Sequence, residues 1–104
     1  MGNINKVEVD KFLLKVKNGD ISKLYKNILY NLVMDMKEKT IKQKNRFVLY
    51  YNIIPNQDIT YSMADLARLQ GCSSSAVRYS ILTIRHALIN HKKEEFIEII
   101  KKNR

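Results

Sequence analysis

The chain has 104 residues, 45% of them apolar and 28% charged, which is typical of one small globular domain and excludes a disordered chain. A domain of this length builds one modest core, with little room for an enclosed substrate cavity. Nineteen Lys and Arg against ten Asp and Glu give a net charge of +9. This excess favours an anionic partner, nucleic acid first and an acidic membrane surface second, although a basic surface can also serve solubility alone.

The cellular setting is indicated by cysteine usage and hydropathy. With Cys72 alone, no intramolecular disulfide can form, so we expect a reducing cytoplasm. No apolar run approaches the roughly 20 residues of a membrane span, and charged residues precede any segment that could act as a signal peptide. We therefore expect a cytoplasmic protein with no membrane partner. The abundance of Lys, Ile and Asn indicates an AT-rich genome, such as that of a low-GC bacterium or its plasmids and phages.

Two helices are predicted at the start of the chain. The first, near 8–17, has four apolar residues at helical spacing and ends at Gly19, which suits a left-handed C-terminal position. Asp20 is predicted to cap the second helix, near 20–38. That helix has the clearest apolar stripe in the chain, which we interpret as core, or as core plus a dimer interface. The stripe consists of Ile21, Leu24, Tyr25, Ile28, Leu29, Leu32 and Met36.

The most basic window is residues 36–46, "MKEKTIKQKNR". Its cations do not line one helical face, because steps of two residues rotate by about 200° on a helix. The window is either a helix end and loop that contact phosphates, through Lys42, Lys44 and Arg46, or a solvated connector.

Residues 47–54, "FVLYYNII", fit a short helix that Pro55 terminates. The β-branched and aromatic content also fits a buried strand, because periodicity does not decide over so short a run. A hairpin over 48–61 is the corresponding alternative.

The centre of the sequence predicts two helices joined by a tight turn. They cover 62–69 and 74–89, and the second has one apolar face. The predicted cap and turn residues are Thr60 or Ser62, Gly71 and Ser73. The inward positions of the second helix are Val77, Ile81, Ile84 and Leu88. Such a pair with a small residue at the turn is typical of a helix-turn-helix.

The last segment predicts a helix near 92–102, or the second strand of a wing within 88–100 with Lys92 and Lys93 at its basic tip. We therefore expect a single domain over 1–104 that is mainly α: a helix-turn-helix domain with extra N-terminal helices. A winged helix-turn-helix, with a hairpin in 88–100 or 48–61, is the alternative.

The outward face of the helix over 74–89 carries polar and cationic residues. Arg can fork onto guanine or clamp a phosphate, and serines at a helix N-terminus can bond to base edges or phosphates. Tyr79 can contact a phosphate or a thymine methyl group. The expected DNA contacts are Ser73, Ser74, Ser75, Arg78, Tyr79, Arg85, Lys42, Lys44, Arg46, Lys92 and Lys93.

These motifs carry a family resemblance. The chain reads "SMADLA" at 62–67, "GCS" at 71–73 and "VR" at 77–78, with "RFVL" at 46–49 upstream and Leu88 downstream. In this spacing, residues 46–88 resemble the C-terminal (fourth) region of bacterial sigma factors, whose helix-turn-helix reads the upstream promoter element. The resemblance implies a DNA-binding module. It does not imply a complete initiation factor, because the residues before Arg46 are too few for the promoter-melting region.

The sequence departs from that family at two places. Its "Arg-Tyr-Gly-Leu" is replaced by "NIIP" at 52–55, and its charged base-reading positions are replaced by "SSA" at 74–76. We therefore do not expect the family's usual promoter specificity to carry over to this chain.

Enzymatic chemistry has little support in the sequence. His86 and His91 are five residues apart on different faces, and neither has a cysteine or carboxylate at metal-ligand spacing. There is no Gly-rich phosphate loop, and Cys72 stands where the sigma family has a small apolar residue. We expect no enzyme, no metal and no cofactor.

The expected function is sequence-specific binding of double-stranded DNA by a small bacterial transcription regulator. The first alternative is a plasmid- or phage-encoded accessory protein that binds repeats at an origin of transfer or replication, beside a relaxase or replication protein. The second is an interaction module that binds RNA polymerase through residues 47–54. A homodimer is expected, because one short recognition helix rarely supplies enough affinity by itself.

Overall fold

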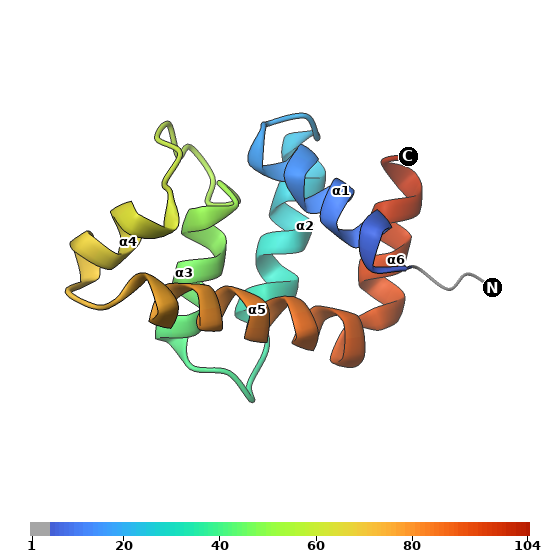
Figure 1. Ribbon diagram of the computed structural model, residues 1–104. Coiled ribbons are helices and arrows are strands. Elements are labelled where there is room, and N and C mark those ends of the chain that lie inside the picture. Colours follow the sequence, from blue (N-terminus) through green and yellow to red (C-terminus); the bar gives the residue numbers. More distant parts are fainter. Residues whose placement is uncertain (1–4) are drawn as a thin grey trace.

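Helices form most of the structure, a computed structural model that describes residues 5–104 (Figure 1). They are α1 (Lys6–Lys17), α2 (Lys23–Met34), α3 (Ile41–Tyr50), α4 (Met63–Gln70), α5 (Ser74–His91) and α6 (Lys93–Lys102). The described residues contain no β-strand, so the prediction of a mainly α fold is confirmed. Residues 1–4 of the predicted domain lie outside the described part.

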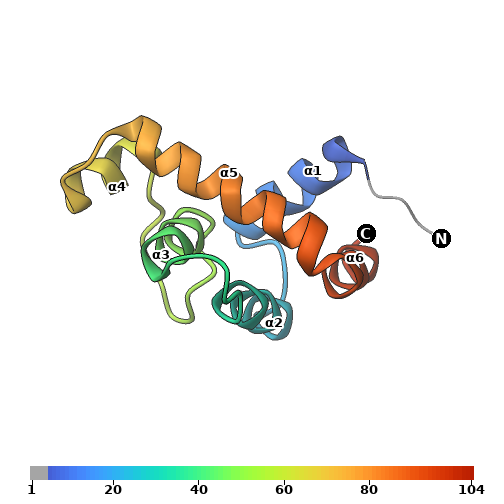
Figure 2. The same cartoon turned by 90° about the horizontal axis from the view of Figure 1, so that it is seen from below.

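Helix α5 runs along the length of the molecule, with α4 at its N-terminal end and α6 at its C-terminal end (Figures 1 and 2). Both α3 and α2 pack against α5, and α3 also contacts α4. The longest helix therefore supports the other elements, because α2, α3, α4 and α6 all pack against it.

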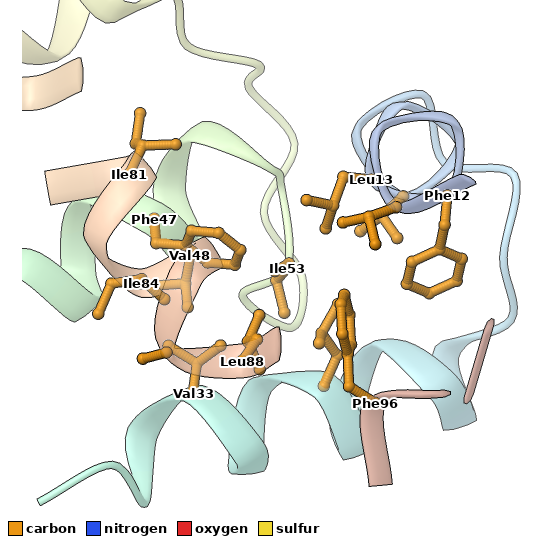
Figure 3. Packing of buried hydrophobic residues seen from close by; sticks show 14 of the residues in the cluster. Phe12, Leu13, Val33, Phe47, Val48, Ile53, Ile81, Ile84, Leu88 and Phe96 are labelled. Atoms are coloured by element: carbon orange, nitrogen blue, oxygen red, sulfur yellow. The ribbon is translucent and has the colours of Figure 1, made fainter. Parts of the chain in front are cut away.

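The core follows the inward face of α5 from end to end. As predicted, Val77, Ile81, Ile84 and Leu88 are all at most 2% exposed. Phe47 and Val48 of α3 lie near this face, as Figure 3 shows, and Val33 of α2 lies beside Leu88. Full burial of each such side chain contributes roughly 1.5–3 kcal/mol.

The other end of the core joins α1 to α6. Phe12 of α1 meets Phe96 of α6 edge to face, with ring centroids 5.9 Å apart. Ile53, which follows α3, lies between this aromatic pair and the residues on α5 (Figure 3). One connected cluster thus includes residues from all six helices.

The end of α1 explains why Asp20 does not cap α2. Gly19 adopts φ +78, and its N–H donates to the carbonyl of Val16, while the N–H of Asp20 donates to Lys15. These are the two hydrogen bonds of a Schellman motif, which commit Asp20 to closing α1. Ser22 caps α2 instead, so the predicted cap is wrong and α2 begins at Lys23.

Helix α2 is shorter than the predicted 20–38, and its apolar stripe is only partly buried. Leu29, Val33 and Met36 are buried, but Leu24 is 62% exposed and Ile28 is 37% exposed. The helix ends at Met34, where the N–H of the C-cap residue Asp35 donates to carbonyls of the last turn. The interpretation of the whole stripe as core is therefore wrong at Leu24 and Ile28, and the alternative of core plus a dimer interface stays a prediction.

The third helix begins and ends earlier than the predicted 47–54. Its start lies inside the basic window, where Thr40 and Gln43 form a capping box. Its end is set by Asn52, which has φ +57 and donates to Leu49, while the N–H of Ile53 donates to Val48. Asn tolerates this left-handed conformation, so a second Schellman motif stops α3 before Pro55.

Neither predicted hairpin forms. Residues 88–100 belong to α5 and α6, which meet at Lys92, and 48–61 contains the end of α3 and a loop without strands. The loop turns at Asn56, with φ +64. The winged alternative in these segments is therefore wrong.

The turn between α4 and α5 gives a direct test of backbone strain. Gly71 has φ +63, and a Cβ built there meets no atom within 4 Å. We expect Gly71→Ala to lower the free energy of unfolding by about 1–2 kcal/mol, from left-handed strain alone. Gly71→Asn should lose less, because Asn tolerates this region. Urea unfolding measures both, and equal stabilities of the two variants would contradict the assignment.

Candidate nucleic-acid interface

The unit formed by α4, a three-residue turn and α5 is fixed by local hydrogen bonds. Ser62 and Asp65 form a capping box at the start of α4, in which each backbone N–H donates to the other side chain at 3.0 Å. These bonds lower the pKa of Asp65 below its usual value. At the turn, the N–H of Cys72 donates to Ala67 at 3.0 Å, and Ser73 accepts from the N–H of Ala76 at 3.1 Å. The predicted caps at Ser62 and Ser73 are confirmed.

The outer face of α5 is open along its first turns. Five of the expected DNA contacts are exposed here: Ser73, Ser74, Ser75, Arg78 and Tyr79. Tyr79 is 66% exposed. Among the described residues, Arg78 takes part in no ion pair or side-chain hydrogen bond. No Asp or Glu occurs between residues 66 and 93. Because a helix N-terminus also carries a partial positive charge, this face attracts anions.

Arg46 lies beneath the turn and not on the surface. It is 8% exposed, and its guanidinium donates to three side chains of α4, the turn and α5. Nε donates to Gln70 at 2.7 Å, Nη1 to Ser80 at 3.0 Å and Nη2 to Cys72 at 3.5 Å. All three guanidinium nitrogens donate inside the protein, so the structure does not place Arg46 on the exposed face with the other expected DNA contacts.

Lys44 and Lys42 have different environments on α3. Lys44 is 8% exposed, and its Nζ donates to the carbonyl of Met34 at 2.9 Å, at the end of α2. It satisfies a helix C-terminus, where a cation is favoured, and is not available as a DNA contact. Lys42 is exposed on the first turn of α3 and remains available to a phosphate.

Arg85 connects α5 to α1. Its side chain is 12% exposed, and Nη2 lies 2.8 Å from Oδ1 of Asp10. This ion pair directs the guanidinium toward α1, away from the other expected DNA contacts on α5. The outer face of α5 is exposed from Ser73 to Leu82 except at the half-buried Ala76, and His86 continues it beyond Arg85.

Lys92 and Lys93 lie at the junction of α5 and α6, half-buried and exposed respectively. An 18-residue helix spans about 27 Å, so these lysines lie far from the residues around Arg78. The structure does not bring them together with the serines of the first turn.

The sequence analysis did not predict three residues that hold the α4–α5 unit in place: Ser80, Gln70 and Lys17. Ser80 is 1% exposed on the inward face of α5, where it accepts from Arg46 and donates to Ala76 at 3.1 Å. The sequence did indicate that Ser80 needs a buried hydrogen-bond partner, because it is a polar residue beside the predicted apolar face of α5. Gln70 had no comparable signal, because it lies at the exposed end of α4.

Lys17 is the third missed residue. Its Nζ donates to the carbonyls of Tyr50 and Tyr61 and lies 3.7 Å from the centroid of the Tyr50 ring. Partial burial lowers the pKa of Lys17. Because Tyr61 precedes the cap of α4, this contact ties the end of α1 to the entrance of the α4–α5 unit.

The contact made by Arg46 leads to a stability prediction. Arg46→Met leaves Gln70 and Ser80 without their donor, so we expect the free energy of unfolding to fall by about 2–4 kcal/mol. Lys42→Met on the same helix removes an exposed cation and should change stability by about 0.5 kcal/mol or less. Urea unfolding at neutral pH compares them, and equal effects would contradict a structural role for Arg46.

The ionisation of the Tyr51 phenol tests how tightly this side chain is packed. Burial, helped by Tyr50, raises the pKa of Tyr51 to about 12. The stability that its neutral phenol contributes is present below pH 10 or so, the ordinary tyrosine pKa, and is lost as the pH rises through about 12. In an absorbance titration, one phenol should ionise only near pH 12. A Tyr51→Phe variant that keeps this late step would contradict the assignment.

Within residues 5–104, no helix is long and apolar enough to cross a membrane, and no three His, Cys, Asp or Glu side chains gather where they could hold a metal ion. Comparison with protein-family models, curated proteins and solved structures finds no significant match to this chain.

Proposed function

We propose that α4, the turn and α5 act as a helix-turn-helix that binds a specific sequence in double-stranded DNA, and that the chain is a small bacterial transcription regulator. The observation that carries this proposal is the first half of α5. It presents an exposed polar face, free of acidic residues, directly after a turn fixed by Gly71.

The dimensions of α5 suit the major groove. A helix with its side chains is about 10–12 Å wide, and the groove is about 12 Å wide. In helix-turn-helix proteins the second helix enters the groove with its N-terminal residues at the bases, while the first crosses the backbone. Ser74, Ser75, Arg78 and Tyr79 occupy the corresponding end of α5.

The charge distribution supports separate roles for the cations. Lys44 and Arg46 donate hydrogen bonds inside the protein, and Arg85 forms an ion pair with Asp10. Arg78 is therefore the cation that can fork onto a guanine or clamp a phosphate within the exposed face of α5. Lys42 is available for a phosphate outside that helix. Net charge of +9 adds sequence-independent attraction to DNA.

A homodimer is part of the proposal. The exposed half of α5 offers few base-reading side chains, and a second copy on an adjacent half-site would double them. An RNA polymerase-binding surface at residues 47–54 has less support, because Phe47, Val48 and Ile53 are fully buried.

Selection of bound sequences from random duplex DNA tests this function and yields a probe for the variants. With the selected duplex, we expect Arg78→Ala to weaken binding by about 1–3 kcal/mol, through loss of a base or phosphate contact. Lys101→Ala, which removes an exposed cation from α6, should have a much smaller effect.

The dependence of DNA affinity on salt concentration is a second test of the proposed function. Affinity should fall steeply as salt rises from low to physiological concentration, because phosphate contacts release counterions. A failure to enrich any sequence, or an Arg78→Ala variant that binds like Lys101→Ala, would contradict the proposed function.

A further inference from the structure

We propose that Tyr79 and Leu82 of α5 read the 5-methyl groups of thymine, so that the chain selects sites with thymine at defined positions. The inference rests on the proposed function and names the chemical group that the same face of α5 recognises. It starts from two large apolar side chains that the core does not use. Tyr79 is 66% exposed and Leu82 is 46% exposed.

The two side chains are neighbours on the face opposite the core. Residues three apart lie on the same side of a helix, and both stand opposite the fully buried Ile84. The inward positions of α5 fill the core without them, and neither Tyr79 nor Leu82 packs against it. Both side chains are therefore accessible to a partner that approaches the outer face of α5.

The charge of this face favours DNA over a second copy of the chain as its partner. Arg78 adjoins Tyr79 in sequence and lies one turn before Leu82, so a cation borders the apolar pair. Two copies of this face packed together would bring two Arg78 guanidinium groups toward each other across an apolar contact. A DNA groove offers phosphates to Arg78, and α5 has no acidic residue to repel them.

Among the groups that base pairs present in the major groove, the thymine 5-methyl is the apolar one that matches these side chains. Cytosine lacks this methyl group and presents an amino donor in its place, for which the side chain of Leu82 has no acceptor. Residues 79 and 82 are separated by about 4.5 Å along the helix, compared with about 3.4 Å per base step. The pair can therefore reach neighbouring base pairs.

Replacement of thymine by deoxyuridine tests the proposal, because it removes the methyl group and leaves base pairing and hydrogen bonds intact. The probe is the duplex recovered by selection, with each thymine replaced in turn. Burial of one methyl group predicts about fourfold weaker binding at one or two positions and no change elsewhere. At those positions, Tyr79→Ala or Leu82→Ala should bind the thymine and deoxyuridine duplexes equally.

Arg78→Ala is the matched control on the same face. It should bind both duplexes more weakly but keep the ratio between them, because it does not contact the methyl group. Equal affinity of the wild type for all substituted duplexes, or a ratio that survives in both the Tyr79 and Leu82 variants, overturns this inference and leaves DNA binding intact. Failure to bind any duplex overturns the proposed function instead.

Discussion

The buried guanidinium of Arg46 holds together the parts of the structure on which its proposed function depends. From α3, it donates to Gln70 at the end of α4, to Cys72 in the turn and to Ser80 inside α5. A planar group with several fixed donors restrains all three segments at once, whereas apolar packing alone is less directional. This side chain therefore helps to fix the angle between α4 and α5, together with the hydrogen bonds of the turn and the buried residues of both helices.

Other cations act in a similar way at the edges of the fold. Lys44 binds the end of α2, Lys17 joins α1 to the residue before α4, and Arg85 joins α5 to α1. The two lysines donate to backbone carbonyls and Arg85 is paired with the carboxylate of Asp10, because a buried charge without a partner is strongly unfavourable. Part of the net charge of +9 thus stabilises the fold. Arg78 is left accessible where the proposed reading helix begins.

The sequence was sufficient where the structure is determined locally. Residue spacing predicts the inward face of α5. Residue type predicts the turn at Gly71 and the N-caps of α4 and α5 at Ser62 and Ser73. The start and end of α3 were predicted at the wrong residues, although both have local signals. The capping box at Thr40 lies within a basic segment, and Asn52 lies within an apolar segment, so neither was recognised as a helix boundary. The burial of Arg46 had no such signal, because its acceptors are 24 to 34 residues away along the chain. Spacing predicts which residues share a face, but not which charges find partners.

DNA binding by α5 is best tested by amide chemical shifts of the isotope-labelled protein, titrated with a duplex selected from a random pool. We expect the largest changes in the turn and the first half of α5, from Ser73 to Leu82. We also expect small changes around Arg85, which is paired with Asp10. Changes concentrated in the groove between α1 and α6, lined by Lys11 and Arg104, would contradict DNA binding by α5, as would the absence of any change.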